Sequence, residues 1–465
     1  MRALVRTSVG LLTLFGTIVH AQEPSNAAIA ARVDSLALAF LNTTHTPAIS
    51  VAVLRGKDTV VMKGYGLAST EPRREATAST IYRIGSITKQ FTSSEIMRLI
   101  ERGKLSLNDP MSKYLPDVPL HGHVVTIRQL LNHTSGIHSY TSSPEWQKTW
   151  AQELTPRQIV AFVDKDTFDF APGAGYRYNN TGYVLLGMII EKITGEKYAA
   201  VLQKEFFTPL GLHQTSYCTN SPTDPSFAAG YSVQGGAVKP AVFLSMTHPF
   251  SAGALCSTVR DLVVWQRALM GGRVVNAKSF ALMTTPDTLN NGSKMNYGFG
   301  LVPGQVGTHK AISHGGGING FTTSGMFFPQ DSVNIAVFSN ADAGPDALAA
   351  NVARAVFGVP LVSGPKPLVA VPLPDADRDR LPGTYDLTTP AGGKFVIHIM
   401  VENGQVVTQA EGPGQGKFPL VHLGNLVFGA SFDPSLRLTF TNENGTITKV
   451  TLQQGGGTME GTRRP

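Results

Sequence analysis

A serine and a lysine lie three residues apart in Ser86-Ile87-Thr88-Lys89, at the beginning of a helical pattern that runs to Gly103. On a helix this spacing places Ser86 and Lys89 on one face, one turn apart. A serine hydroxyl is a poor nucleophile unless a neighbour takes its proton, and a lysine can do so when burial or a nearby cation lowers its pKa. The pair alone also fits a capping serine beside a solvated lysine, so its meaning depends on other residues.

Two further groups of residues could complete such a site. Tyr178 and Asn180 end the loop 172–180, where Tyr178 could carry a proton and Asn180 could offer its amide. By themselves they also fit a turn tyrosine with an Asx cap. His314 is followed by three glycines and ends a short strand predicted over 310–313. Glycines allow a close backbone approach, and a backbone N–H can point at a developing oxyanion.

The elements around these residues indicate an α+β domain over 26–362. Strand patterns lie at both ends of this region and helical patterns lie between them. We therefore expect one antiparallel sheet, built from both ends of the domain and flanked by helices, with a helical subdomain between. The predicted elements are a helix over 26–41, a hairpin of 48–54 and 59–65, a helix over 182–194, a helix that starts at Thr258 with Asp261 completing a capping box, and strands over 323–328 and 334–340.

The composition changes after this domain. Residues 363–379 include Gly364-Pro365-Lys366-Pro367 and further prolines, a composition typical of an extended linker. Over 380–465 the patterns are those of strands, with alternating runs and two Asn-Gly turns. We predict that this region forms a separate small all-β domain, a barrel or a sandwich.

The composition excludes several classes of protein. Hydrophobic residues make up 42% of the 465 residues, which is enough for a large buried core, and the length is natural for two domains. The net charge of +7 comes from scattered lysines and arginines, whereas a nucleic-acid binder needs a concentrated basic face. We therefore expect no nucleic-acid partner.

The first 21 residues read as an export signal. Arg2 and Arg6 precede an apolar stretch over 8–19, and Val19-His20-Ala21 fits a signal-peptidase cleavage pattern. The apolar stretch is too short to span a bilayer, and no later segment qualifies, so the mature chain is expected to lack an integral membrane segment. In an oxidising compartment Cys218 and Cys256 are candidates for one disulfide, the alternative being two buried free thiols.

The chain resembles the penicillin-recognising serine hydrolases, in the branch that holds class C β-lactamases, DD-carboxypeptidases, D-aminopeptidases and related esterases. The resemblance covers roughly 49–357, and it implies the β-lactamase-like fold for this region. The C-terminal region resembles the lipocalin-like barrel found on some of these hydrolases. The matched motifs are S-x-x-K at Ser86 and Lys89, Y-x-N at Tyr178-Asn179-Asn180, H-x-G at His314-Gly315-Gly316, and the further likenesses Thr126–Leu131, His133–Gly136 and Tyr297–Gly300.

The resemblance also implies roles for individual residues. Ser86 would be the nucleophile that forms the acyl-enzyme, and Lys89 and Tyr178 would share the roles of general base and general acid. Asn180 would orient the substrate amide or the lysine. The N–H groups of Ser86 and Gly317 would form the oxyanion hole, beside His314 and Gly316 as substrate-binding residues. Class C β-lactamases have a lysine in place of His314, and an imidazole binds a substrate carboxylate more weakly than a lysine ammonium does. This difference favours a peptidase, aminopeptidase or esterase over an efficient β-lactamase.

The sequence therefore predicts a serine hydrolase, secreted to the periplasm or beyond the cell, that forms an acyl-enzyme on Ser86. Its substrate would be a small molecule or peptide with an amide or ester bond: a D-amino-acid peptide, a β-lactam or a short-chain ester. No metal or cofactor is expected, and the oligomeric state stays open. The alternative is a non-catalytic or slowly turning over protein that binds penicillins or peptidoglycan fragments. Ser86, Lys89 and Tyr178 together favour the enzyme, since a binding protein does not need all three.

Overall fold

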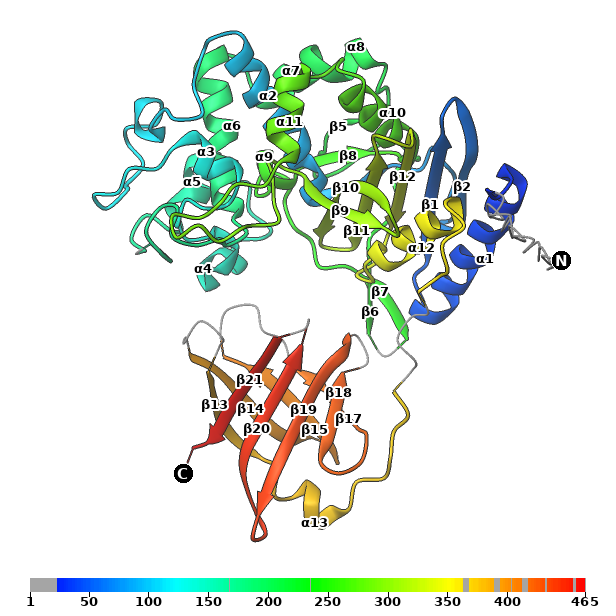
Figure 1. The fold of residues 1–465 in the computed structure, drawn as a ribbon, viewed down its shortest axis with the longest axis vertical. Helices are drawn as coiled ribbons and strands as arrows, with labels where there is room; N and C mark the ends of the chain where they lie inside the picture. Colours follow the sequence, from blue (N-terminus) through cyan, green and yellow to red (C-terminus); the bar gives the residue numbers. More distant parts are fainter. Residues whose placement is uncertain are drawn as a thin grey trace, which may run out of the picture.

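A computed structural model describes residues 23–166, 168–234, 236–362, 368–388, 394–402, 404–411, 417–430, 433–454 and 457–464. The predicted export signal over 1–21 lies outside the described residues, as does 363–367 of the predicted linker. Figure 1 shows the two described bodies, an α+β domain with helices around a sheet and a smaller β domain beside it.

The α+β domain is organised around one seven-stranded antiparallel sheet, as the sequence predicts. Its order is β3-β2-β1-β12-β11-β10-β9. β1 pairs with β12, for example Ala52 with Ala336, so the two ends of the domain meet at the centre of the sheet. The strands are β1 (Ala48–Arg55), β2 (Asp58–Thr70), β3 (Arg73–Glu75), β9 (Val302–Val306), β10 (His309–Ile318), β11 (Phe321–Phe328) and β12 (Val333–Ser339).

The central strands are buried on both faces. In β12, Ile335 and Val337 pack in a core with helices α1 (Asn26–Thr44) and α12 (Asp346–Val356). Ala336 and Phe338 alternate with them and belong to the larger core on the opposite face. Because successive side chains of a strand point to opposite faces, one strand serves both cores. Figure 1 shows α1 and α12 on one side of the sheet and the other helices beyond it.

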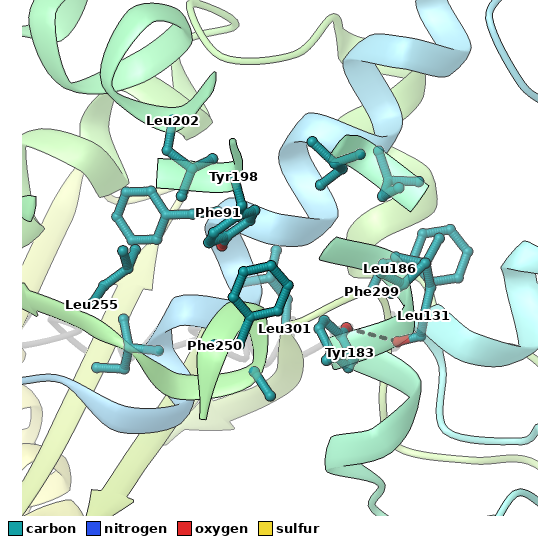
Figure 2. Packing of buried hydrophobic residues seen from close by; sticks show 14 of the residues in the cluster. Phe91, Leu131, Tyr183, Leu186, Tyr198, Leu202, Phe250, Leu255, Phe299 and Leu301 are labelled. Carbon is teal, nitrogen blue, oxygen red and sulfur yellow. Dashed lines mark hydrogen bonds between the residues drawn. The ribbon is translucent and has the colours of Figure 1, made fainter. Parts of the chain in front are cut away.

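The remaining helices form the larger core and carry most of the candidate site. Figure 2 shows Phe91 of helix α2 with Tyr198, Leu202 and Phe250 nearby in this core. Tyr183 donates its hydroxyl to the Leu131 carbonyl at 2.8 Å, which satisfies a polar group inside this core. The helices are α2 (Thr88–Glu101), α3 (Ile127–Leu131), α4 (Pro144–Gln147), α5 (Pro156–Ala161), α6 (Asn180–Thr194), α7 (Tyr198–Leu202), α8 (Thr208–Leu210), α9 (Phe250–Gly253), α10 (Val259–Met270) and α11 (Ala277–Thr284).

Two local expectations need correction. The glycine run after His314 does not follow a short strand, because β10 continues through it to Ile318 and pairs with β11. The capping box of α10 is only half formed: the Thr258 hydroxyl accepts the Asp261 N–H, but the Asp261 carboxylate accepts hydrogen bonds from Gln214 and Thr215 instead. The Asp261 carboxylate therefore bonds to residues distant in the sequence instead of to the backbone at the start of its own helix.

The predicted disulfide is present. Cys218 and Cys256 are bonded, with 5.3 Å between their Cα atoms. Cys256 lies in β8 (Leu255–Ser257), the middle strand of a small sheet with β4 (Tyr82–Arg83) and β5 (Ser216–Tyr217). The bridge therefore fixes the loop after β5 to the strand that pairs with β4, just before Ser86.

The C-terminal domain is a nearly closed nine-stranded antiparallel barrel, in agreement with the predicted all-β region. Its order is β16-β15-β14-β13-β21-β20-β19-β18-β17. Ile397, Ile399, Leu438 and Phe440 are buried in a core made only of residues from this part of the chain. The elements are helix α13 (Asp375–Arg378) and strands β13 (Gly383–Thr388), β14 (Lys394–Glu402), β15 (Gln405–Ala410), β16 (Phe418–Pro419), β17 (Val421–His422), β18 (Val427–Ala430), β19 (Asp433–Glu443), β20 (Thr446–Gln454) and β21 (Gly457–Arg463).

The separate cores lead to a prediction about the isolated α+β domain. A chain that ends at Val362 should unfold cooperatively, because no residue of the barrel core belongs to its own cores. In scanning calorimetry, its transition temperature should match one of the transitions of the whole chain within a few degrees. A truncated chain without a cooperative transition would show that the barrel is needed for folding.

Candidate active site

Ser86 lies in a single 3-10 turn, Gly85–Ile87, between β4 and α2. Gly85 has a φ of +50°, a conformation that side chains disfavour, and a Cβ there would lie 2.9 Å from the Gly317 nitrogen. The backbone of β10 therefore approaches the turn more closely than any residue with a side chain at position 85 would permit. This contact places Ser86 beside the glycine run that the sequence singled out.

Lys89 is fully buried and its amine lies among three oxygen atoms. Its Nζ is 3.0 Å from Ser86 Oγ, 2.8 Å from Asn180 Oδ1 and 2.8 Å from the Ala252 carbonyl oxygen. No carboxylate contacts it among the described residues. Burial without a counter-ion holds the pKa of Lys89 well below its usual range.

The three oxygens around Lys89 Nζ can be hydrogen-bonded by either protonation state, and the lowered pKa favours the neutral amine. A neutral amine has two N–H bonds and one lone pair, whereas an ammonium has three N–H bonds and no acceptor. Asn180 Oδ1 and the Ala252 carbonyl can only accept, so they take the two N–H bonds. In the neutral amine this leaves the lone pair for the Ser86 hydroxyl, 3.0 Å away. In this state Lys89 can accept the serine proton.

Tyr178 and Asn180 lie where the loop enters helix α6. The side chain of Asn179 caps this helix by accepting the Gly182 N–H at 2.7 Å, and this cap fixes both neighbours. Loss of hydration at the phenol raises the pKa of Tyr178, although 37% of the residue is exposed, and the neighbouring Ser86 hydroxyl opposes that shift. Tyr178 thus keeps its proton at neutral pH, and the Lys89 amine lies 4.7 Å from the centre of its ring.

His314 is buried and uses both ring nitrogens within the protein. Nδ1 lies 2.5 Å from the Gly315 carbonyl, which can only accept, so Nδ1 carries the hydrogen. Nε2 then accepts the hydroxyl of Tyr297 at 2.9 Å. Burial, assisted by the nearby Lys89, lowers the pKa of His314 to about 4. The imidazole is therefore neutral at neutral pH.

The glycines of β10 have different surroundings. A Cβ on Gly316 would lie 2.0 Å from the Ile84 carbonyl oxygen, whereas a Cβ on Gly317 would have nothing within 4 Å. Gly316 therefore permits the packing of β10 on the strand that leads to Ser86. Gly317 borders a cavity of about 120 Å³ that Ser86, Asn180 and Trp146 also line.

The structure brings all seven predicted site residues to one region and adds three groups that the sequence analysis did not assign. The Ala252 carbonyl accepts from Lys89, the Tyr297 hydroxyl donates to His314, and Thr141 lies 3.4 Å from Asn180 Nδ2. Tyr297 begins the segment Tyr297–Gly300, which the family resemblance already included. That likeness could have pointed to Tyr297 as a residue of the site. A backbone carbonyl leaves no signal in residue type, so the role of Ala252 was not predictable.

A serine, a buried amine within hydrogen-bond distance of it and a phenol that keeps its proton are groups that a serine hydrolase site requires. The comparisons with known proteins agree. The family model described as Beta-lactamase matches residues 27–358, so the chain belongs to the Beta-lactamase family.

Individual relatives are hydrolases or penicillin-binding proteins. The D-aminopeptidase of Gluconobacter oxydans is 26% identical over 414 residues, which cover 83% of this chain and 76% of that protein. Penicillin-binding protein 4* of Bacillus subtilis is 30% identical over 59% of this chain, which spans only 64% of that relative's length. The D-stereospecific amidohydrolase from Streptomyces sp. matches with a TM-score of 0.61 and 31% identity, over 72% of this chain and 99% of that one.

The packing of β10 leads to a second prediction. Gly316→Ala should lower the free energy of unfolding by about 1–3 kcal/mol or more, because its Cβ would overlap the Ile84 backbone, which cannot rotate away. Gly304→Ala is the matched control, since Gly304 lies in the neighbouring strand β9 and has open space around its Cβ position. Urea unfolding of both variants measures the difference. Equal stabilities would contradict the close contact.

Proposed function

We propose that this protein forms an acyl-enzyme on Ser86 with an amide or ester substrate and then hydrolyses it. The observation that carries this proposal is the buried Lys89 amine, which lies 3.0 Å from Ser86 Oγ and 2.8 Å from both Asn180 Oδ1 and the Ala252 carbonyl, with no carboxylate partner among the described residues. A structural lysine would be paired with a carboxylate or reach solvent, since an isolated buried charge is costly. A lysine held neutral beside a serine suits a general base.

The steps follow from the protonation states. Lys89 takes the hydroxyl proton as Ser86 Oγ bonds to the substrate carbonyl carbon, and the carbonyl oxygen becomes an oxyanion. The N–H groups of Ser86 and Gly317 stabilise that oxyanion. Tyr178 gives its proton to the departing nitrogen or oxygen, the bond to the carbonyl carbon breaks, and the proton on Lys89 restores Tyr178. Water then attacks the acyl-enzyme with the same groups in reverse, which frees Ser86.

The substrate class follows from the His314 arrangement and from the relatives. Because His314 is neutral and both its nitrogens are occupied, position 314 supplies no cation for a substrate carboxylate. This argues against an efficient β-lactamase. The similarity to a D-aminopeptidase and to a D-stereospecific amidohydrolase supports an amide or short peptide of a D-amino acid.

We also propose export of the protein. The basic and apolar pattern over 1–21 supports it, and a disulfide between Cys218 and Cys256 is consistent with an oxidising compartment. Of the helices in the part of the chain that the structure describes, none has the length and apolarity to cross a membrane.

The nucleophile assignment predicts the outcome of covalent labelling. Wild-type protein should gain one adduct from a fluorophosphonate probe, located on Ser86 by mass spectrometry, and Ser86→Ala should gain none. Ser79→Ala, which alters an exposed serine a few residues away, should label like the wild type. Turnover of a chromogenic N-acyl-D-amino-acid amide by the wild type distinguishes an enzyme from the alternative of a penicillin-binding protein that is only acylated. An adduct on Ser86→Ala would refute the assignment.

The neutral state of Lys89 predicts a pH effect. Asn180→Asp would place a carboxylate where the amide oxygen now lies 2.8 Å from the amine, which favours the ammonium and raises the pKa of Lys89. Since only the neutral amine accepts the serine proton, the acid limb of the acylation rate should move to higher pH, by about one unit or more.

Asn180→Ser is the matched control for this pH effect, since it removes the amide without adding charge. The acid limb of its acylation rate should lie at a lower pH than that of Asn180→Asp. An acid limb that lies at the same pH in both variants would contradict the role of Lys89 as the base.

A further inference from the structure

A second cavity lies beside the candidate active site. It has a volume of about 170 Å³, and we name it the Arg83 pocket after the charged residue in its wall. Other lining residues include Phe227, Phe243, Asn319 and Phe321. The lining contains no carboxylate among the residues that the structure describes. The pocket is thus an apolar and amide-lined cavity with one positive charge.

Arg83 has few partners for a guanidinium that is mostly removed from solvent. Within the described part of the chain it forms no ion pair, and its one hydrogen bond runs from Nη1 to the Leu244 carbonyl at the long distance of 3.5 Å. Its guanidinium carbon lies 5.9 Å from the centre of the Phe321 ring. Burial lowers the pKa of Arg83, in keeping with the lack of an ion-pair partner among the described residues. Arginine stays protonated in proteins, so most of its five N–H donors remain available.

The pocket and the active-site cavity share a wall. Asn319 lines both cavities, and the consecutive residues Phe243 and Leu244 line one each. Arg83 itself contacts Leu244 and precedes Ser86 by three residues. The Arg83 pocket is therefore adjacent to the Ser86 cavity, with Asn319 in the wall between them.

The chemistry of acyl transfer decides which part of a substrate lies there. The leaving group must accept a proton from Tyr178, so it lies on the side of Tyr178 and His314, whose ring centres are 6.2 Å apart. Neither residue lines the cavity that leads to Asn319. The acyl part of the substrate, which stays on Ser86, is therefore placed on the other side of Ser86, in the cavity whose wall includes Asn319.

We propose that the Arg83 pocket binds a carboxylate carried by the acyl part of the substrate, which makes this protein selective for anionic acyl groups. The proposal rests on the function proposed above and adds a specificity-determining residue, Arg83, to it. A guanidinium presents paired N–H donors that match a carboxylate, and such charge-assisted bonds are strong when partly shielded from water. The same charge disfavours a substrate with a free ammonium at that position, as an aminopeptidase substrate would have.

The test compares acyl groups that differ only in charge. D-Alanine p-nitroanilide is prepared with N-malonyl, N-succinyl and N-glutaryl groups, and each is paired with its neutral counterpart: N-propionyl, N-butyryl and N-valeryl. For at least one chain length the wild type should show a kcat/KM for the anionic member about tenfold higher or more than for the neutral member. Free D-alanine p-nitroanilide should be the poorest substrate. Added salt should reduce the preference.

Two sets of variants test whether the preference for anionic acyl groups arises in the Arg83 pocket. Arg83→Gln should reduce the anionic-to-neutral ratio to near one, with the neutral substrate as the reference within each variant, and Arg83→Lys should restore part of it. Phe243→Asp places a negative charge at an exposed position of the pocket lining and should invert the ratio, whereas Phe243→Asn should not. The Phe243 pair keeps the test valid if Arg83→Gln fails to fold, because Phe243 is 46% exposed.

The outcomes separate this proposal from the hydrolase proposal. If the neutral substrates are cleaved in a Ser86-dependent manner but no chain length shows a preference for the carboxylate, the Arg83 pocket does not bind an anion. A preference that survives in folded Arg83→Gln or in Phe243→Asp also overturns the assignment. If the wild type cleaves none of the substrates and takes up no label on Ser86, the hydrolase proposal fails, and the pocket proposal fails with it.

Discussion

The site depends on one arrangement, a lysine amine buried without a counter-ion between a serine and two oxygen acceptors. Lys89 is 0% exposed, and its acceptors come from two other parts of the chain, Asn180 at the start of α6 and Ala252 in α9. Moving either element by about an ångström would break a hydrogen bond or open the amine to water, and the pKa would return toward its usual value. The helical core around Phe91 and Tyr183 holds these elements together, so packing far from substrate maintains the chemistry.

Burial sets the protonation states of the whole site in one direction, toward neutral groups. The pKa values of Lys89, His133 and His314 are lowered, whereas that of Tyr178 is raised. His133 accepts the Asn179 N–H on Nδ1, so it supports the loop that presents Tyr178. A site without fixed charges lets the charge that develops during acyl transfer be stabilised by oriented dipoles. The guanidinium of Arg83 in the neighbouring pocket contrasts with this neutrality, which is why it is informative about the substrate.

Much of this could be predicted from the sequence because several local patterns agreed. The helix that follows Ser86, the sheet built from both ends of the domain and the disulfide are present in the structure. The failures have tertiary causes: β10 extends through its glycines because β11 pairs with them, and Asp261 contacts Gln214 rather than its own helix terminus. The Ala252 carbonyl could not be found from residue type, and the Tyr297–His314 contact joins the loop before β9 to strand β10, which only the folded chain brings together.

The central claim, that Lys89 is a neutral amine at neutral pH, can be measured directly by NMR of the protein labelled with ¹³C at the ε-carbon of lysine. The Lys89 resonance is assigned by its loss in Lys89→Met. The account predicts that this resonance titrates far below the ordinary lysine range near ~10.4, while the exposed lysines titrate within it. A Lys89 resonance that titrates together with those of the exposed lysines would contradict the account, because a charged lysine cannot take the proton of Ser86.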